Sequence, residues 1–329
     1  MLSEESLELI VQDHLAELEW VSGHGPDFAP GSGERDTWND IVLRGRLRNA
    51  VRNLNPGVPE EYLDQAIGEV ITPKSQSAIA ENRRIHQILV EGYRGIEYID
   101  YEGNVQNPTI YFLSSQPHRN DYLSLNQVTV ANLDGERRFD VVCYVNGMPL
   151  AFIELKKTGA NTSVEGAYNQ LQTYVKEFGM AFRFANIVIP SDDLSAKYGT
   201  PFTPWNHFAP WNVDEDGSPV DPNNMVVAGE PVTQLDLLLD GLFNVERFGQ
   251  LFSDFTAFDD TAEGLVMRIA KPHQYFAVTK AVGSTITAAR GDKRAGVIWH
   301  TTGAGKSMEM ELYTAKIMRR REMLSPCLL

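Results

Sequence analysis

The stretch Arg138-Phe-Asp-Val-Val-Cys-Tyr-Val-Asn-Gly-Met-Pro-Leu-Ala-Phe-Ile-Glu-Leu-Lys156 decides the fold predicted for this chain. Asn146-Gly147 is a strong signal for a tight β-hairpin turn, because both residues tolerate the positive φ that such a turn requires. The runs on either side are apolar at consecutive positions, which is typical of strands buried on both faces. We therefore predict a central, buried hairpin.

Three ionisable residues, Asp140, Glu154 and Lys156, lie at the far end of this hairpin from its turn. Burial of such groups is costly unless they are paired or bind a ligand, so their register matters. A two-residue turn pairs Asp140 with Ile153 and places Asp140 and Glu154 on opposite faces of the sheet. That register separates the two carboxylates.

The other register needs one additional residue on the second strand. A three-residue loop over 146–148, or a bulge, pairs Val145 with Pro149. This register brings Asp140 opposite Glu154, with the lysine two positions further along the same face. We predict this second register.

In that arrangement Asp140 and Glu154 would hold one or two Mg²⁺ ions through carboxylate oxygens, and Lys156 would orient the attacking hydroxide. Gln170 and Tyr174 lie one helical turn apart and can lean over the same site. The pattern predicts a metal-dependent nuclease site. The alternatives are a surface ion pair that caps two strands and, for Tyr174, a core aromatic.

A second motif, His300-Thr-Thr-Gly-Ala-Gly-Lys-Ser307, follows a predicted strand and opens a predicted helix. Its glycines would let backbone N–H groups converge on phosphate oxygens at the N-terminus of that helix. The alternative is a glycine turn that merely carries Lys-Ser. The predicted ATP-binding residues are Thr302, Gly303, Ala304, Gly305, Lys306 and Ser307, with the Lys306 ammonium on the β- and γ-phosphates and the Ser307 hydroxyl on the Mg²⁺ of MgATP.

The surrounding sequence predicts an α/β protein with helices first, a mixed sheet with one embedded helix next, and a P-loop unit last. We expect a first domain over residues 1–260, with a core at about 77–195 and an irregular and helical connection over 196–260, and the start of a second domain over 261–329. Only 22 residues follow Ser307, so we expect the front of a longer motor. Expected helices are 3–20, 38–53, 59–71, 77–91, 164–178, 235–242, 245–252, 274–290 and 306–321, and expected strands are 109–113, 125–131, 138–145, 150–156, 182–190 and 295–299.

Composition excludes several classes of protein. The chain is 43% hydrophobic and 22% charged, with a formal net charge of −15, which argues against a histone-like protein that binds DNA by bulk charge. No apolar run approaches the length needed to cross a bilayer, and the acidic start lacks the positive charge of a signal peptide. Two cysteines cannot form a disulfide framework. We expect a cytoplasmic protein with no membrane partner.

The two motifs, in this order, resemble the N-terminal part of the restriction (motor) subunit of type I restriction–modification enzymes. The resemblance extends from the helix around Leu7-Glu8 to the loop at Lys306-Ser307, and it includes Gln170-x-x-x-Tyr174. It implies a PD-(D/E)xK restriction-endonuclease-like sheet flanked by helices, followed by the first part of a RecA-like domain of a superfamily 2 translocase.

The resemblance also implies roles for individual residues. Asp140, Glu154 and Lys156 fall on the catalytic positions of the family. Glu8 sits where many such folds carry an additional helical acid, and a solvated helix glutamate is the alternative. Gln274 resembles an adenine-reading glutamine, with a helix-surface glutamine as the alternative.

The implied activity is ATP-dependent translocation coupled to Mg²⁺-dependent cleavage of double-stranded DNA. It would require modification (methyltransferase) and specificity subunits as partners. Two other hypotheses stay open: a catalytically idle, truncated assembly module, and a P-loop nucleotide-binding protein whose N-terminal half is a scaffold.

Overall fold

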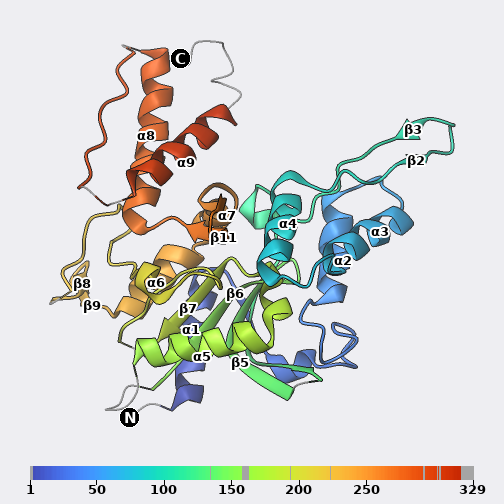
Figure 1. The fold of residues 1–329 in the computed structure, drawn as a ribbon, viewed down its shortest axis with the longest axis horizontal. Coiled ribbons are helices and arrows are strands. Elements are labelled where there is room, and N and C mark those ends of the chain that lie inside the picture. The colour runs from blue at the N-terminus through green and yellow to red at the C-terminus, as the bar shows by residue number, and fades with distance from the viewer. Residues whose placement is uncertain are drawn as a thin grey trace.

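A computed structural model describes the chain over residues 3–133, 135–157, 163–192, 194–222, 224–291, 293–301, 303 and 305–319. A mixed five-stranded sheet of order β1-β4-β5-β6-β7 lies at its centre (Figure 1). The two outer pairs, β1 with β4 and β6 with β7, are parallel, whereas the inner pairs are antiparallel. The strands are β1 (Val21–His24), β4 (Tyr122–Asn132), β5 (Gly135–Val145), β6 (Met148–Leu155) and β7 (Ile187–Ser191).

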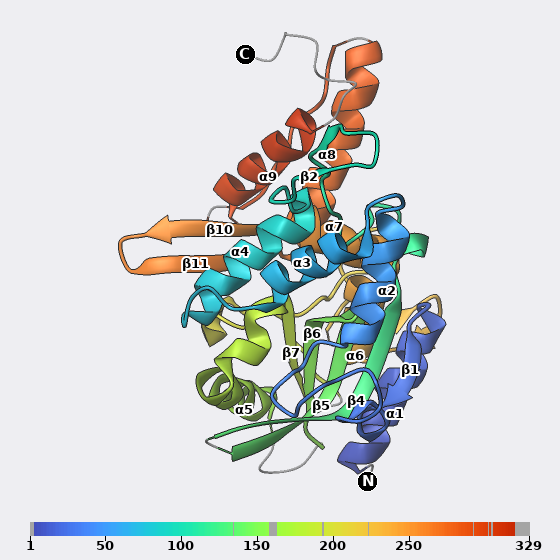
Figure 2. The same ribbon diagram turned by 90° about the vertical axis from the view of Figure 1, so that its right-hand side faces the viewer.

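The predicted hairpin is the middle of this sheet. Every residue of β6 is buried, and β5 is buried from Val141 to Val145, so the apolar runs are covered on both faces. Helix α5 lies against one face of the sheet and α1 against the other (Figure 2). Each face therefore has its own hydrophobic core.

Serine side chains cap three helices of this part. The hydroxyls of Ser3, Ser77 and Ser163 each accept a hydrogen bond from the backbone N–H three residues later, which satisfies a free N–H of the first turn. The helices of this part are α1 (Glu4–Glu17), α2 (Arg44–Leu54), α3 (Glu60–Ile71), α4 (Ala78–Glu91) and α5 (Val164–Glu177).

Two strand predictions are wrong in this part. The segment 109–113 makes only one bridge, between Ile110 and Tyr93, because the Asn55 side chain bonds both the N–H and the C=O of Tyr111 at 2.8 Å. The segment 182–190 begins as a 3₁₀ helix (Gly179–Phe184), and only its second half forms β7. The short hairpin of β2 (Tyr98–Ile99) and β3 (Val105–Gln106) projects from the body (Figure 1).

The C-terminal part packs on the same body through α6, α7 and β11. The strand predicted over 295–299 is absent from the described residues: this segment has no regular structure, and Val297 and Trp299 are 91% and 89% exposed. No described strand lies beside it, so its backbone has no ladder to join. The elements of this part are β8 (Val226–Val227), β9 (Glu230–Pro231), α6 (Gln234–Phe243), α7 (Val245–Asp254), β10 (Thr256–Thr261), β11 (Gly264–Ile269), α8 (Pro272–Arg290) and α9 (Lys306–Met318).

The β10–β11 hairpin spans the position, 260/261, at which we expect the second domain to begin, and that division stays a prediction. None of the described helices combines the length and the hydropathy that a membrane crossing requires.

Candidate functional site

The turn of the central hairpin has two residues. Asn146 and Gly147 have φ of +52° and +79°, and Val145 lies opposite Met148. The three-residue loop, with Val145 opposite Pro149, is therefore wrong. The sequence Asn-Gly imposes the tighter turn because both of its residues accept positive φ.

A bulge nevertheless produces the predicted register further along. Near the turn, Tyr144 lies opposite Pro149. Between Tyr144 and Cys143 the pairing shifts by one residue, so that Val141, further from the turn, lies opposite Ile153. The same register, continued by one position, places Asp140 opposite Glu154. The bulge inserts the residue that the turn does not supply.

The ladder between β5 and β6 ends where the carboxylates begin. Oδ2 of Asp140 accepts a hydrogen bond of 2.8 Å from the backbone N–H of Leu155, so the side chain bridges the two strands at the point where they part. Burial raises the pKa of Asp140, against the opposing effect of this hydrogen bond and of Lys156.

Glu154 and Lys156 form an ion pair at this point. Glu154 is 1% exposed, and its Oε1 accepts a 2.8 Å hydrogen bond from Nζ of Lys156. Burial, followed by the charge of Asp140, raises the pKa of Glu154 to about 8. Burial lowers the pKa of Lys156, but the Glu154 carboxylate outweighs it and the net shift is upward. The structure thus brings all three predicted residues together.

Glu8 approaches the same place from α1 and is not a solvated glutamate. It is 2% exposed, and its carboxylate accepts hydrogen bonds from the side-chain amides of Asn126 and Gln127. Burial raises its pKa, and so does the charge of Asp140.

The two amides that hold Glu8 were not predicted from the sequence. Gln127 has φ of +56°, and the β4–β5 pairs on either side of it, Asn126 with Val141 and Val128 with Phe139, place it opposite Asp140. A signal was available, because apolar residues occupy odd positions before Gln127 and even positions after it. Such a break in alternation indicates an irregular strand.

Gln170 and Tyr174 lie on one face of α5, as predicted. Nε2 of Gln170 donates to the Tyr174 hydroxyl at 2.5 Å, and the tyrosine ring packs edge-on against Phe139 at 5.5 Å between centroids. Burial raises the pKa of Tyr174, as does the charge of Glu154. Tyr174 is therefore both a core aromatic and a neighbour of the carboxylates.

These residues fit a divalent cation. Glu154 is a buried carboxylate whose pKa is raised by burial and by the charge of the half-buried Asp140, and a cation between the two would offset that repulsion. No cluster of three or more His, Cys, Asp or Glu side chains that could hold a metal occurs among the described residues. Water or phosphate oxygens would therefore have to complete the coordination, as is usual for Mg²⁺.

The phosphate-loop candidates lie at the start of α9. Gly303 and Gly305 have φ of +86° and +85°, which favours glycine at both positions. Nζ of Lys306 donates to the carbonyls of His300 and Thr301 at 3.2 and 3.0 Å. Ser307 is exposed in the first turn of the helix, and Thr302 and Ala304 lie outside the described residues.

Gln274 contacts this loop directly. It is 4% exposed, its Oε1 accepts from the backbone N–H of Lys271 at 2.9 Å, and its Nε2 donates to the carbonyl of Gly305 at 3.3 Å. The alternative of an exposed helix-surface glutamine is wrong. Its role as an adenine-reading residue stays a prediction.

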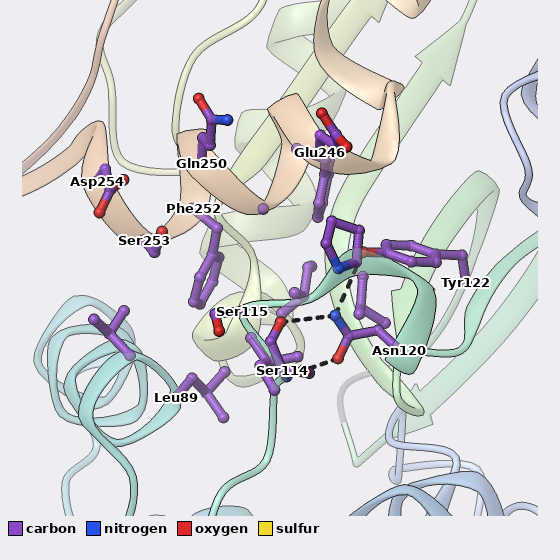
Figure 3. Close-up of a pocket in the computed structure, with 17 residues that line it drawn as sticks. Leu89, Ser114, Ser115, Asn120, Tyr122, Glu246, Gln250, Phe252, Ser253 and Asp254 are labelled. Atoms are coloured by element: carbon purple, nitrogen blue, oxygen red, sulfur yellow. Dashed lines mark hydrogen bonds between the residues drawn. The ribbon is translucent and has the colours of Figure 1, made fainter. Parts of the chain in front are cut away.

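A cavity of about 430 Å³ lies between α4, α7 and the segment before β4 (Figure 3). Leu89 and Phe252 face it from the two helices, and Asn120 is held on its wall by the backbone of Ser114. None of the predicted site residues lines this cavity, so it is separate from the chemistry described above.

Comparisons with known proteins agree with the two motifs. The chain matches the family model of the type I restriction enzyme R protein N terminus over residues 1–207, and that of the SWI2/SNF2 ATPase over residues 273–328. It is 31% identical, over 99% of its length, to the type I restriction enzyme HindI endonuclease subunit of Haemophilus influenzae. It is 28% identical, over 95% of its length, to the MjaIXP endonuclease subunit of Methanocaldococcus jannaschii.

The aligned regions cover 31% of each of these relatives, so the chain spans less than a third of their length. The resemblance inferred from the motifs is confirmed, and the first family model covers well over half of the residues. The chain belongs to the family of type I restriction enzyme R proteins and corresponds to their N-terminal region.

Proposed function

We propose that this chain carries the Mg²⁺-dependent endonuclease site of a type I restriction enzyme R protein, on a PD-(D/E)xK restriction-endonuclease-like sheet, and that the site cleaves double-stranded DNA. The observation that supports this most is the convergence of Asp140, Glu154 and Lys156 where β5 and β6 part. Holding three ionisable groups in a largely buried position lowers the stability of the folded chain, and such groups cluster at catalytic sites.

Each side chain has a distinct role in this proposal. Asp140 and Glu154 would hold Mg²⁺, which when bound lowers the pKa of a water molecule and offsets the charge that develops on the phosphate. Lys156 would orient the attacking oxygen once the carboxylate it now contacts binds the cation. Because the pKa of Glu154 is about 8, binding of the cation at neutral pH would release a proton from this pair.

We propose that the region after residue 261 begins a RecA-like unit that binds ATP through Lys306, Ser307 and Gln274. The contact between Gln274 and Gly305 supports this, because it links the candidate base-reading residue to the loop. In the full-length protein, ATP turnover would drive translocation along DNA. Modification and specificity subunits would select the DNA, and the complex would act in the cytoplasm, where DNA and ATP are available.

Cleavage of supercoiled plasmid by the 329-residue chain tests the nuclease proposal. We expect relaxation in Mg²⁺ and none in EDTA. Asp140→Asn and Lys156→Met should each slow cleavage by about 100-fold or more, since removal of several kcal/mol of transition-state stabilisation has that effect. Asp13→Asn, on the exposed side of α1, is the matched control and should cleave like the parent chain.

Equal cleavage by the parent chain and Asp140→Asn would contradict the nuclease proposal. Co-purification with the modification subunits, without any Mg²⁺-dependent cleavage, would favour the idle assembly module instead. The nucleotide proposal has a separate test, which is titration of a fluorescent ATP analogue into the parent chain and Lys306→Ala. Equal affinity would contradict it.

A further inference from the structure

Most arginine side chains of the described residues form ion pairs with carboxylates or donate hydrogen bonds to carbonyls. Those on α2 illustrate this, because Arg46 pairs with Asp121 at 2.6 Å and Arg48 with Asp64 at 2.8 Å. Within the described residues, three arginine side chains have no hydrogen bond or ion pair: Arg94, Arg119 and Arg138.

Arg138 is the one of these three that lies beside the candidate nuclease site. Arg138 precedes Asp140 by two residues on β5, so their backbones are roughly 7 Å apart along the strand. On the neighbouring strand β4 it lies opposite Thr129. Its side chain is exposed. Its positive charge acts on both Asp140 and Glu8, lowering the pKa of each against the effect of burial.

Its sequence neighbour shows what a structural arginine looks like here. Nη2 of Arg137 pairs with Oε2 of Glu177 at 2.7 Å, and its guanidinium lies over the Phe178 ring at 5.9 Å. Arg137 therefore fastens β5 to the end of α5. Arg138 makes no such contact within the described residues, although it is adjacent in the chain.

The local charge balance at the site is unfavourable for DNA. Glu8 and Asp140 are acidic, and the nearby ammonium of Lys156 is hydrogen-bonded to Glu154. The whole chain carries a net charge of −15, so no general positive field attracts the phosphate backbone. A DNA strand that reaches the carboxylates therefore needs a cation at the site with free donors.

We propose that Arg138 is a substrate-binding residue of this site, whose guanidinium binds a DNA phosphate next to the scissile one. The inference rests on the proposed nuclease function, because it assumes that DNA passes over Asp140 and Glu154. A guanidinium suits this role, since it presents paired donors to phosphate oxygens and stays charged at any relevant pH.

Duplex binding by the 329-residue chain in EDTA tests the proposal without cleavage. We measure the fluorescence anisotropy of a labelled 30-base-pair duplex over a series of salt concentrations. Arg138→Ala should weaken binding about fivefold and reduce the salt slope by about one ion, as expected for one lost phosphate contact. Arg138→Lys should recover part of the affinity. Arg119→Ala removes the same charge from an exposed arginine elsewhere and should bind like the parent chain.

Identical affinity and salt slope for Arg138→Ala and the parent chain would overturn the proposal. So would an equal loss in Arg119→Ala, because the effect would then be one of net charge. The kinetic counterpart in Mg²⁺ is a raised KM for Arg138→Ala with a kcat within about twofold. If Arg138→Ala weakens binding while Asp140→Asn leaves cleavage unchanged, the DNA contact holds and the nuclease assignment falls.

Discussion

The two motif regions of this chain start from similar sequence signals and end in different structural states. Both place ionisable residues after an apolar run that reads as a strand. Around Glu154 the run is a strand with neighbours on both sides, and every residue of β6 is buried. Before Lys306 the run has no regular structure, and Trp299 is 89% exposed. A strand-forming sequence positions a site only where other strands pair with it.

The glycines of the two turns should show the largest difference in stability. A Cβ on Gly147 would lie 2.4 Å from the carbonyl oxygen of Leu43 and 2.8 Å from the backbone nitrogen of Leu47. Gly147 also has positive φ. Gly147→Ala should therefore lower the free energy of unfolding by about 3 kcal/mol, from strain and steric overlap combined. Urea denaturation monitored by circular dichroism measures this loss.

Gly303→Ala is the counterpart in the other region. Its φ of +86° also disfavours alanine, but a Cβ there would meet no described atom within 4 Å. We expect the main unfolding transition to shift by less than about 0.5 kcal/mol, since the strain stays in an exposed loop. A loss as large as that of Gly147→Ala would show that the loop is part of the cooperative core, and the contrast between the regions would fail.

The second effect is on the pH dependence of stability. Burial raises the pKa of Glu154 from its ordinary value of 4.5 to about 8, so the folded state holds a proton that the unfolded state has released. The contribution of Glu154 to stability in EDTA should therefore fall as pH rises from about 5 to 8, by at most about 1.4 kcal/mol per pH unit. Glu154→Gln should flatten this slope. Urea denaturation at pH 5, 6, 7 and 8 measures it.

Mg²⁺ provides the control for this experiment. The cation binds the deprotonated carboxylates, so it should stabilise the parent chain more at pH 8 than at pH 6, and Glu154→Gln much less at either pH. An equal slope in the parent chain and Glu154→Gln would mean that another group titrates in this window.

The sequence predicted the central hairpin and the group of three residues because their determinants are local. Asn146-Gly147 specifies the turn, and the continuous apolar runs specify burial on both faces. How the extra residue enters the β5–β6 pairing, by a bulge or by a longer turn, was less predictable. The bulge after Cys143 shifts the register by one residue, and no local pattern in the sequence specifies its position.

Glu8 shows the limit of sequence reasoning more clearly. From the sequence alone, Glu8 could equally be a solvated glutamate on the surface of α1 or an additional acid of the site. The helix periodicity does not reveal which residues from other elements cover it. Its carboxylate accepts hydrogen bonds from Asn126 and Gln127, which are more than a hundred residues away in the chain. The strand predicted over 109–113 was wrong for a similar reason. The side chain of Asn55 makes the hydrogen bonds with the backbone of Tyr111 that a neighbouring strand would otherwise make.

The third effect concerns the affinity of the proposed nuclease site for a divalent cation. Glu8 lies near Asp140 and accepts a hydrogen bond from the side-chain amide of Gln127 on β4. Glu8→Gln should weaken Mn²⁺ binding about tenfold, as is typical for residues around the direct ligands. Isothermal titration calorimetry measures the affinity. Glu5→Gln, exposed on the same helix, should bind Mn²⁺ like the parent chain, and equal affinity in Glu8→Gln would exclude Glu8 from the site.

The smallest effect tests the connection between the two regions. Asp254, at the end of α7, accepts Nζ of Lys316 at 2.7 Å and Nη1 of Arg319 at 3.1 Å, and both cations come from the C-terminal end of α9. The Lys316 side chain is only 8% exposed and also lies over the Phe255 ring at 4.5 Å. These partly buried ion pairs connect α9, which follows the candidate phosphate loop, to α7 and so to the body that carries the candidate nuclease residues.

Asp254→Asn should loosen α9 without loosening the sheet. Loss of a charged hydrogen bond at a partly exposed acid is worth about 1 kcal/mol, or roughly a fivefold rise in hydrogen exchange of the α9 amides. Amides of β5 and β6 should keep their protection, because their ladder does not involve α9. Asp64→Asn, which removes an exposed ion pair with Arg48, should change neither segment. Equal acceleration of exchange in α9 and β6 would mean that the two regions unfold as one unit, so that the exposed run before Lys306 belongs to the same cooperative structure as β5 and β6.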